Sequence, residues 1–554
     1  MMGSPLLKVA DTLDVNQLIQ SENSLFGAVN HSPEFFNEMR FLDGSIRPTY
    51  QDVVRWIESQ NIENVLALNH AATESFYRKG ITFTVYTDAC DTERVIPFDI
   101  IPRIIALKEW HIMQAGCAQR IRALNAFLHD IYHKQDIIRA GIIPAAQIFA
   151  NPCFQPWMLN VDLPGQIYAH ISGIDLVRHG DGMYYVLEDN LRTPSGVSYM
   201  LEGRAISQQL MPSLFAKNNI LGVEEYPALL KKTLIESTMV ENPLIVVLTP
   251  GRFNSAYYEH AFLAREMGVP LVNGHDMFVD GAEVFLNTVA GRQKVDVIYR
   301  RLDDPFLDSL AFRPDSVLGV AGMMSAYRAG NVILANAPGT GVADDKSIYP
   351  FVPDMIDFYL GEKPILHNVQ TWQCRKPDDL KYVLAHLPEL VVKEAQGSGG
   401  YGMLIGPQAS KAELEEFKRK LIAEPEAYIA QPTLALSVCP TLIDEKIVPR
   451  HIDLRPFVLS SPSQVRTVAG GLTRVALTEG SLVVNSSQGG GIKDTWVVDL
   501  EKSDELQAET ETTVITVTEM MGNTEILDLA LEKTAVITAT DFKLSDTTQI
   551  GANV

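Results

Sequence analysis

The chain has 554 residues, of which 46% are hydrophobic and 21% are charged, as in ordinary soluble globular proteins. This length predicts about three or four domain-sized units with large cores. The formal net charge of -22 at pH 7 argues against a protein that binds nucleic acid or anionic membranes through overall basic charge. A local cluster of Lys and Arg would still be enough to bind a phosphate.

The five cysteines are scattered along the chain and form no C-x-x-C pair. A disulfide framework or a structural zinc site is therefore not expected, and a cytoplasmic location is. We expect no signal peptide, because the N-terminus lacks a basic segment followed by a long apolar run. We also expect no membrane span, because no uninterrupted apolar stretch of about 20 residues occurs.

Residues 1–150 are expected to be mostly helical, with short strands. Apolar residues at helical spacing predict one long helix over residues 101–130. His129 and His133 lie four residues apart at its end. No third ligand or general base is evident near them, so we interpret them as surface or packing histidines and not as zinc ligands.

The stretch 171–196 predicts a β-hairpin. Two apolar runs flank the turn His179-Gly180-Asp181-Gly182, whose glycines allow a positive φ. The simplest register pairs Arg178 with Met183 across this turn. Asp175 then lies opposite Val186.

Three oxygen-bearing side chains of this hairpin are expected to point the same way, because Glu188 and Asn190 share the face of Asp175 in that register. Two carboxylates and an amide oxygen suit Mg²⁺, a hard cation that takes oxygen ligands. The alternative is a hairpin with a polar, solvated end.

Residues 241–345 predict an α/β unit. The apolar run 244–248 predicts a buried strand, 249–252 a turn, Asn254 the cap of a helix to Met267, and 269–272 the next strand. The strand 295–301 ends in Arg300 and Arg301. These arginines indicate either a salt-bridged strand end or recognition of an anionic substrate.

Residues 346–502 predict another α/β stretch, in which the strand 390–394 carries Lys393 and runs into a glycine-rich segment, 397–402. Glycines let a backbone approach a ligand closely and point amides at phosphate oxygens. The segment is no P-loop and no dinucleotide fingerprint, because no G-K-[ST] follows and the next segment is of β type. Lys346 follows another glycine-containing loop, and 427–434 is an extended segment that could act as a hinge.

Several further polar residues lie on predicted strands near the C-terminal end of this stretch. His451, Asp453 and Arg455 alternate and so share a strand face, and Arg474 and Asn485 follow. Each alone is interpreted as structural. The segment 503–554 is rich in Thr and acidic residues, and we expect a weakly packed tail without chemistry.

Together these features resemble the ATP-grasp fold. The resemblance is carried by Glu188-Asp189-Asn190 with Pro194-Ser195-Gly196, by Lys346 and Lys393, and by the glycine-rich segment. In most ATP-grasp enzymes the E-x-N motif follows the lysine and the glycine loop, whereas here it precedes them. The chain therefore resembles the circularly permuted ATP-grasp type 2 family, which is similar to the synthetase domain of glutathionylspermidine synthase.

The resemblance implies a mixed α+β and α/β chain with a circularly permuted ATP-grasp fold, an inserted α/β substrate-side domain and a helical N-terminal region. The expected divisions are 1–150 for the helical region, 151–240 for the first part of the ATP-grasp fold, 241–345 for the substrate-side domain, 346–502 for the remainder and 503–554 for the tail.

The resemblance also implies the cofactors ATP and Mg²⁺ and a role for each candidate residue. Implied are Mg²⁺ ligands (Asp175, Glu188 and Asn190), phosphate-binding lysines (Lys346 and Lys393), a phosphate-covering loop (Gly397, Ser398, Gly399, Gly400, Tyr401 and Gly402), an adenine-side hinge (Gln431, Pro432, Thr433 and Leu434) and substrate-side arginines (Arg192, Arg252 and Arg300). Glu188 and Asn190 are expected to face the lysines and the loop across one cleft.

The implied activity is an ATP-dependent carboxylate–amine ligase that forms an amide through an acyl phosphate, with small-molecule or peptide substrates and no nucleic-acid or membrane partner. Two alternatives stay open at this point. One is a phosphotransferase that stops at a phosphorylated product, and the other is a nucleotide-binding protein whose catalysis has lapsed.

Overall fold

A large mixed β-sheet carries the predicted hairpin. The computed structural model describes residues 16, 24–26, 34–85, 92–397, 402–485 and 489–501, all within a unit that spans Met1–Ser503. The sheet runs in the order β13-β5-β4-β19-β22-β23-β3, with β18 paired to β19, and with β20 paired to both β4 and β21. Its strands are β3 (Phe98–Ala106), β4 (Ile171–Arg178), β5 (Tyr184–Asn190), β13 (His367–Asn368), β18 (Val438–Ile443), β19 (Lys446–Arg455), β20 (Phe457–Ser460), β21 (Val465–Thr467), β22 (Leu472–Val475) and β23 (Gly491–Val498).

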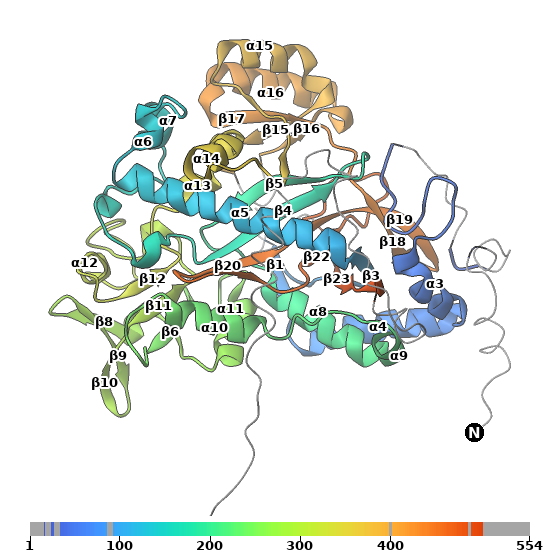
Figure 1. Cartoon of the computed structure of the whole chain (residues 1–554), viewed down its shortest axis with the longest axis horizontal. Helices are drawn as coiled ribbons and strands as arrows, with labels where there is room; N and C mark the ends of the chain where they lie inside the picture. The colour runs from blue at the N-terminus through green and yellow to red at the C-terminus, as the bar shows by residue number, and fades with distance from the viewer. Residues whose placement is uncertain are drawn as a thin grey trace, which may run out of the picture. The chain divides into compact units, whose positions relative to one another are not determined.

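Both faces of this sheet are covered by helices. Successive side chains of a strand point to opposite faces, so the apolar strands contribute to two cores, one under each layer of helices. In β23, Trp496 and Val498 pack into one core and Val497 into the other. Helix α5 (Leu107–Tyr132) crosses the face on the Val497 side, and helices α4 (Ile62–Arg78) and α8 (Val197–Leu210) pack on the opposite face (Figure 1).

The predicted helix over 101–130 is wrong at its start. Residues 98–106 form β3, which pairs in parallel with β23, and α5 begins only at Leu107. Ile104 and Ile105 pack into different cores, as neighbours on a strand buried on both faces do, and the isoleucines at 100–101 and 104–105 also satisfy a helical spacing. Farther along the chain, α8 ends at Leu210 and Pro212 begins a separate helix, α9 (Pro212–Lys217).

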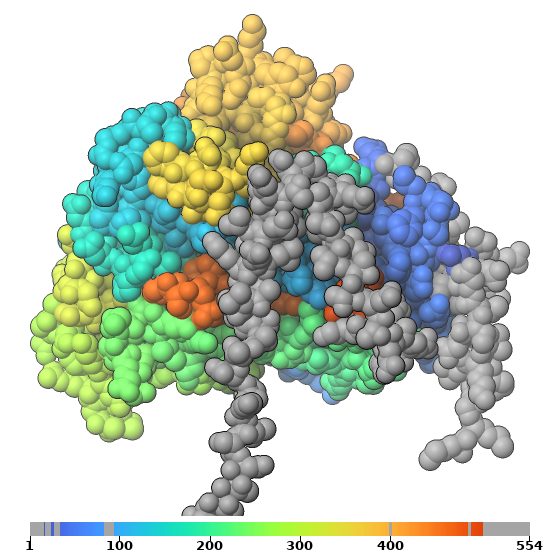
Figure 2. All heavy atoms as spheres, viewed as in Figure 1, coloured from blue at the N-terminus to red at the C-terminus, as the bar shows by residue number. Residues whose placement is uncertain are grey.

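A smaller antiparallel sheet forms a separate lobe. It runs in the order β14-β17-β15-β16 and carries helices α15 and α16, which stand above the large sheet in Figure 1; the same part of the chain projects at the top of Figure 2. A capping box starts α16, with the side chains of Ser410 and Glu413 each bonded to the other residue's backbone N–H. Its elements are β14 (Trp372–Gln373), β15 (Leu390–Glu394), β16 (Leu404–Ile405), β17 (Tyr428–Pro432), α15 (Pro377–His386) and α16 (Lys411–Ala423).

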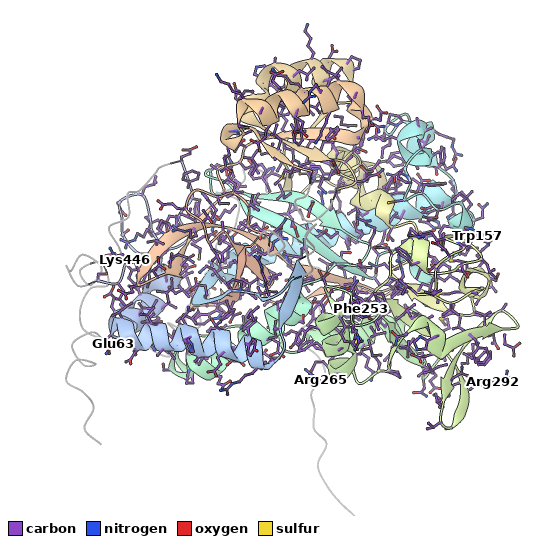
Figure 3. The ribbon with its side chains drawn as sticks, turned by 180° about the vertical axis from the view of Figure 1, so that it is seen from behind. Glu63, Trp157, Phe253, Arg265, Arg292 and Lys446 are labelled. Carbon is purple, nitrogen blue, oxygen red and sulfur yellow. The ribbon has the colours of Figure 1, made fainter. Side chains whose placement is uncertain are left out.

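The segment predicted as an α/β unit contains a parallel sheet in the order β12-β11-β6-β7, with a β-meander from β8 to β10 inserted between β7 and β11. Seen from behind, Arg265 of α11 and Arg292 of the meander lie in this part of the molecule (Figure 3). Its elements are α10 (Tyr226–Glu236), β6 (Ile245–Leu248), α11 (Tyr257–Met267), β7 (Leu271–Val272), β8 (Met277–Asp280), β9 (Glu283–Thr288), β10 (Gly291–Lys294), β11 (Val297–Arg300), α12 (Met323–Arg328) and β12 (Ile333–Ala335).

The remaining elements flank these sheets. They are α3 (Gln51–Glu58), β1 (Thr82–Val85), β2 (Thr92–Val95), α6 (Asp136–Arg139), α7 (Ala145–Phe149), α13 (Gly341–Asp344) and α14 (Val352–Leu360). Lys346 follows the short helix α13 and does not open a helix. The predicted tail, 503–554, lies outside the described residues.

A buried ion pair ties the hairpin to α5. Arg120 donates from Nε and Nη2 to the two carboxylate oxygens of Asp189 at 2.6 and 2.7 Å, and its Nη1 donates to Asn368 at 2.6 Å. Both side chains of the pair are at most 2% exposed. This pair fixes the back of β5, so the residues beside Asp189 face away from α5.

Replacing Asp189 by Ala should lower the free energy of unfolding by about 3–5 kcal/mol, because it leaves the Arg120 charge buried without a partner. Urea unfolding followed by circular dichroism measures the change. Arg122→Ala is the matched control on the same helix. Its ion pair with Glu362 is half-exposed, so the expected change is about 1 kcal/mol or less. Equal effects of the two substitutions would contradict the role given to the buried pair.

Candidate functional site

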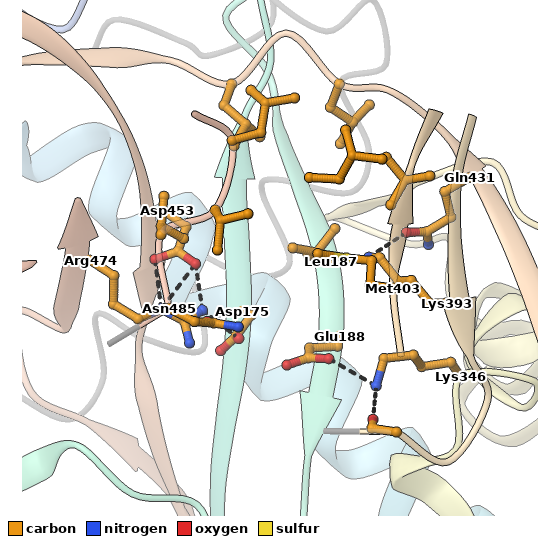
Figure 4. A pocket seen from close by; sticks show the side chains of 18 of the residues that line it. Asp175, Leu187, Glu188, Lys346, Lys393, Met403, Gln431, Asp453, Arg474 and Asn485 are labelled. Atoms are coloured by element: carbon orange, nitrogen blue, oxygen red, sulfur yellow. Dashed lines mark hydrogen bonds and ion pairs between the residues drawn. The ribbon is translucent and has the colours of Figure 1, made fainter. Parts of the chain in front are cut away.

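Two connected cavities lie where the small lobe meets the large sheet. The smaller, about 130 Å³, is lined from one side by β15 and β17 and from the other by the hairpin, including Leu187 and Glu188 (Figure 4). The larger, about 540 Å³, extends past Asn190 and Arg192 to residues at the start of α11. The two cavities share five lining residues: Glu188, Lys346, Gly397, Arg474 and Asn485.

The hairpin reaches these cavities through a register that differs from the prediction. Arg178 pairs with Tyr184 and not with Met183, and Asp175 lies opposite Glu188 and not opposite Val186. A bulge between these two pairs adds Leu187 to β5. Without the extra residue, Glu188 would point to the face of α5. The predicted shared face of Asp175 and Glu188 therefore exists, but the bulge produces it.

Asp175 is held by two arginines. Its carboxylate accepts hydrogen bonds from Arg455 Nε and Nη2, at 2.5 and 2.7 Å, and from Arg474 Nη2 at 2.7 Å. Arg474 also bridges to Asp453, its cross-strand neighbour on β19. Burial alone would raise the pKa of Asp175, but the two arginines hold it well below its usual range. These four charged groups join β4, β19 and β22 at the floor of the cavities.

Glu188 faces Lys346 across the cleft, as Figure 4 shows. Lys346 Nζ lies 3.2 Å from Glu188 Oε2 and donates to the backbone oxygen of Gly397 at 2.6 Å. Arg455 Nη2 lies 3.9 Å from the other oxygen of Glu188. Asn190 lines the larger cavity and donates from Nδ2 to Gly173 O at 3.3 Å, which leaves its side-chain oxygen available as an acceptor.

Lys393 lies on the small-lobe wall of the smaller cavity. Its Nζ donates to Gln431 Oε1 at 2.8 Å, and Gln431 in turn donates to Thr371. Burial lowers the pKa of Lys393 to about 8, with Lys346 acting in the same direction and Glu188 opposing it. Gln431, Pro432 and Leu434 line this cavity, whereas Thr433 instead bonds the backbone of Glu389.

The wall of the smaller cavity is largely apolar. Leu187 from the hairpin and the run 482–484 contribute to it, together with small-lobe residues such as Met403. The run 482–484 was not predicted as part of the site. The only signal for it in the sequence is three consecutive aliphatic residues beside Asn485. Of the predicted glycine-rich loop, Gly397 lines both cavities; Ser398, Gly399, Gly400 and Tyr401 lie outside the described residues.

The three predicted arginines occupy different places. Arg192 lines the larger cavity and donates from Nε to Asp344 at 2.8 Å. Burial raises the pKa of Asp344 to about 6, with Arg192 opposing the shift. Arg252 is exposed, with its guanidinium 5.1 Å from the ring centre of Phe253 on the face seen in Figure 3, and it does not line the cavity.

Arg300 does not reach the cavity either. Its side chain is fully buried and bonds the backbone oxygens of Asn336, Ala337 and Leu302 and the carboxylate of Asp304. The next residue, Arg301, lines the larger cavity together with His260. Side chains alternate along an extended segment, so only one of two adjacent arginines can face the cavity. The prediction named Arg300, whereas Arg301 is the one that faces it.

Magnesium requires oxygen ligands, and the cleft supplies some of them. Among the described residues, no three His, Cys, Asp or Glu side chains are grouped so that they could hold a metal ion by themselves. Glu188 and the free oxygen of Asn190 supply hard ligands on one wall, and Lys346 stands opposite them. This set fits a magnesium ion that shares its shell with phosphate oxygens, which is the usual way proteins bind it.

Comparisons with other proteins show the family of the chain. The family model described as circularly permuted ATP-grasp type 2 matches residues 102–476. An uncharacterized protein of Synechocystis sp. is 49% identical over 471 residues, covering 84% of this chain and 97% of its own length. A Frankia alni protein, whose name assigns it to the glutamate–cysteine ligases, is 41% identical over 84% of this chain, which spans only 54% of that protein.

A solved structure shows the same fold at much lower identity. It is a glutathione synthetase-like effector from Globodera pallida, with a TM-score of 0.51, 10% identity, and coverage of 79% of this chain and 98% of its own. In addition, no helix among the described residues is long and apolar enough to cross a membrane. The chain belongs to the circularly permuted ATP-grasp type 2 family.

Proposed function

We propose that this protein joins a carboxylate to an amine through an acyl phosphate, with conversion of ATP to ADP and phosphate. The observation that carries the proposal is the approach of Glu188 to Lys346, at 3.2 Å, in a cleft that Lys393 and Asn190 also line. Phosphoryl transfer needs positioning and charge neutralisation more than a protein nucleophile. This cleft offers fixed cations, hydrogen-bond donors and hard metal ligands within one enclosed space.

In the proposed complex, the apolar cavity beside Gln431, Pro432 and Leu434 takes the adenine. Lys346, Lys393 and the segment from Gly397 bind the phosphates. Glu188 and Asn190 would hold Mg²⁺, which neutralises phosphate charge when bound. Asp175, which is paired with Arg455 and Arg474, would be a further carboxylate for that ion. Arg192, which keeps its terminal nitrogens beyond the bond to Asp344, contacts the transferred phosphate.

The substrates are proposed to meet in the larger cavity. The named activity of the Frankia relative supports an amino-acid substrate only weakly, because the matched region is about half of that protein. The glutathionylspermidine synthase likeness supports the reaction type and not the polyamine substrate. Arg252 and Arg300 are left out of the proposed site, since neither lines the cavity. A cytoplasmic location is proposed from the free thiols, three of which are buried.

Glu188→Gln should lower ADP formation about a hundredfold or more, because it removes the charge that a metal needs while it keeps the side-chain volume. The assay supplies Mg²⁺, ATP, a panel of amino acids and short peptides as carboxylates, and hydroxylamine as the amine. Glu283→Gln, a half-exposed residue of the meander, is the control and should match the unmodified protein.

The same assay separates the remaining activities. An acyl phosphate reacts with hydroxylamine to give a hydroxamate, which a colour reaction with ferric iron detects. ADP together with a stable phosphorylated product and no hydroxamate would replace the ligase by a phosphotransferase. ADP formation that is unchanged in Glu188→Gln would remove the hairpin from the proposed site.

Affinity for ATP should fall as the pH rises above about 8, because the buried Lys393 then loses the proton that gives it charge. With that pKa the dissociation constant should be about tenfold higher at pH 9 than at pH 7. Titration of a non-hydrolysable ATP analogue with Mg²⁺ measures it. Lys393→Arg keeps the charge throughout this range and should flatten the profile. Parallel profiles of the two proteins would assign the pH dependence to another group.

A further inference from the structure

One wall of the larger cavity has no role in the proposed binding of nucleotide. It is formed by the end of β11 and by the loop that leads into α11. It comprises Asn254, Ser255, Ala256, His260 and Arg301. His260 and Arg301 are 2% and 5% exposed, so this wall contains two buried side chains that can carry hydrogen-bond donors.

Arg301 keeps unused donors although it is buried. Its Nη1 donates to Pro194 O at 2.7 Å and to the Tyr299 hydroxyl at 3.0 Å, and its Nη2 donates to Glu259 at 3.1 Å. A guanidinium has five N–H groups. One Nη2 hydrogen remains, and Nε has no partner among the described residues.

Glu259 fixes Arg301 in place and is itself fully satisfied. Its Oε2 accepts from Gly196 N at 2.7 Å, from Ser198 N at 3.1 Å and from the Ser198 hydroxyl at 3.0 Å. The charge of this carboxylate is offset by its ion pair with Arg301, and the backbone and hydroxyl donors stabilise it further.

His260 presents a neutral donor. Its Nδ1 lies 2.9 Å from the hydroxyl of Thr249, which already accepts from Gly251 N at 3.1 Å. The Thr249 hydroxyl can donate a hydrogen bond to Nδ1, and in that tautomer the ring carries its hydrogen on Nε2. Burial and the nearby Arg301 lower the pKa of His260 to about 2, so the ring is neutral at physiological pH. Nε2 bonds no described residue, and the ring lines the cavity.

The loop before α11 adds donors of the same kind. Asn254 Oδ1 accepts from Ala256 N at 2.9 Å, so its Nδ2 is the group left to donate, and Ser255 contributes a hydroxyl. These residues precede an 11-residue helix, whose N-terminus favours negative charge. The wall therefore combines the Arg301 guanidinium with several neutral donors. The one buried carboxylate behind it, Glu259, already has its own partners.

We propose that this wall is a binding site for a substrate carboxylate, and that the ligand is an amino acid or a peptide and not a polyamine. Arg301, His260 Nε2 and the loop 254–256 would hold the carboxylate that does not react. Asp303, exposed on the same cavity two residues beyond Arg301, is placed to meet an ammonium group. This inference rests on the proposed ligase reaction, for which it names the substrate class.

The test compares ligands that differ only in the carboxylate. Thermal shift and calorimetric titration of the full chain, with Mg²⁺ and a non-hydrolysable ATP analogue, use the twenty common amino acids, a panel of dipeptides, the C-terminal amide of each, and spermidine. At least one amino acid or dipeptide should bind at least tenfold more tightly than its amide, and more tightly than spermidine. Ligands that bind no better than their amides, or no binding by any amino acid or dipeptide, would overturn the proposal.

Variants then assign the site. His260→Phe keeps an aromatic ring but removes the donor, so it should weaken the amino acid about tenfold and leave its amide and the ATP analogue unchanged. Thr249→Val, which removes the group that orients the ring, should act in the same direction. His275→Phe, on an exposed histidine of the same part of the chain, is the control. Equal weakening of amino acid and amide in the first two variants would overturn the assignment.

Repeating the amino-acid and amide titrations without nucleotide separates the two proposals. If the unmodified protein does not bind the ATP analogue, the proposed nucleotide site is refuted. If it still binds the carboxylate ligand more tightly than the amide without nucleotide, the carboxylate site is supported independently.

Discussion

The buried charges of Asp175, Asp453, Arg455 and Arg474 constrain the rest of the site. They come from three neighbouring strands, β4, β19 and β22, and none of them could be buried alone without a large cost in desolvation. Each arginine therefore requires a carboxylate, and the strands must keep the register that brings them together. These ion pairs fix the register of the three strands at the floor of the cleft, and the hairpin that carries Glu188 is built on that floor.

The bulge at Leu187 connects this constraint to function. It is placed between the pair Leu176–Val186, which belongs to the core under α5, and the pair Asp175–Glu188, which faces the cleft. One extra residue thus lets a single short strand serve both needs, since Asp189 can bond Arg120 on one face while Glu188 meets Lys346 on the other. Bulges that re-aim a side chain in this way are frequent beside active sites.

Much of this arrangement could be predicted from the sequence, because it follows from local patterns. Alternating apolar runs and glycines gave the hairpin, the strand that carries Lys393 and the capping box of α16. What could not be predicted depends on contacts between distant segments. The hairpin register depends on a bulge that β4 and α5 stabilise together, and β3 is a strand only because β23 lies beside it. The choice between Arg300 and Arg301 depends on Asn336 and Glu259, far away in the chain.

The charge balance of the cleft bears on how the proposed ligands would enter. Glu188 is paired with Lys346, and Asp175 with Arg455 and Arg474, so without ligands the cations and carboxylates neutralise one another. A phosphate that bound Lys346 or an arginine alone would leave the partner carboxylate unpaired and repelled by the phosphate. A metal ion that bound a carboxylate alone would leave its partner cation unpaired. Each ligand alone therefore works against the existing pairs. Phosphate and Mg²⁺ bound together would satisfy both sides, with the carboxylates available to the metal and Lys346 and the arginines available to the phosphates. On this reasoning the proposed nucleotide would bind as its magnesium complex.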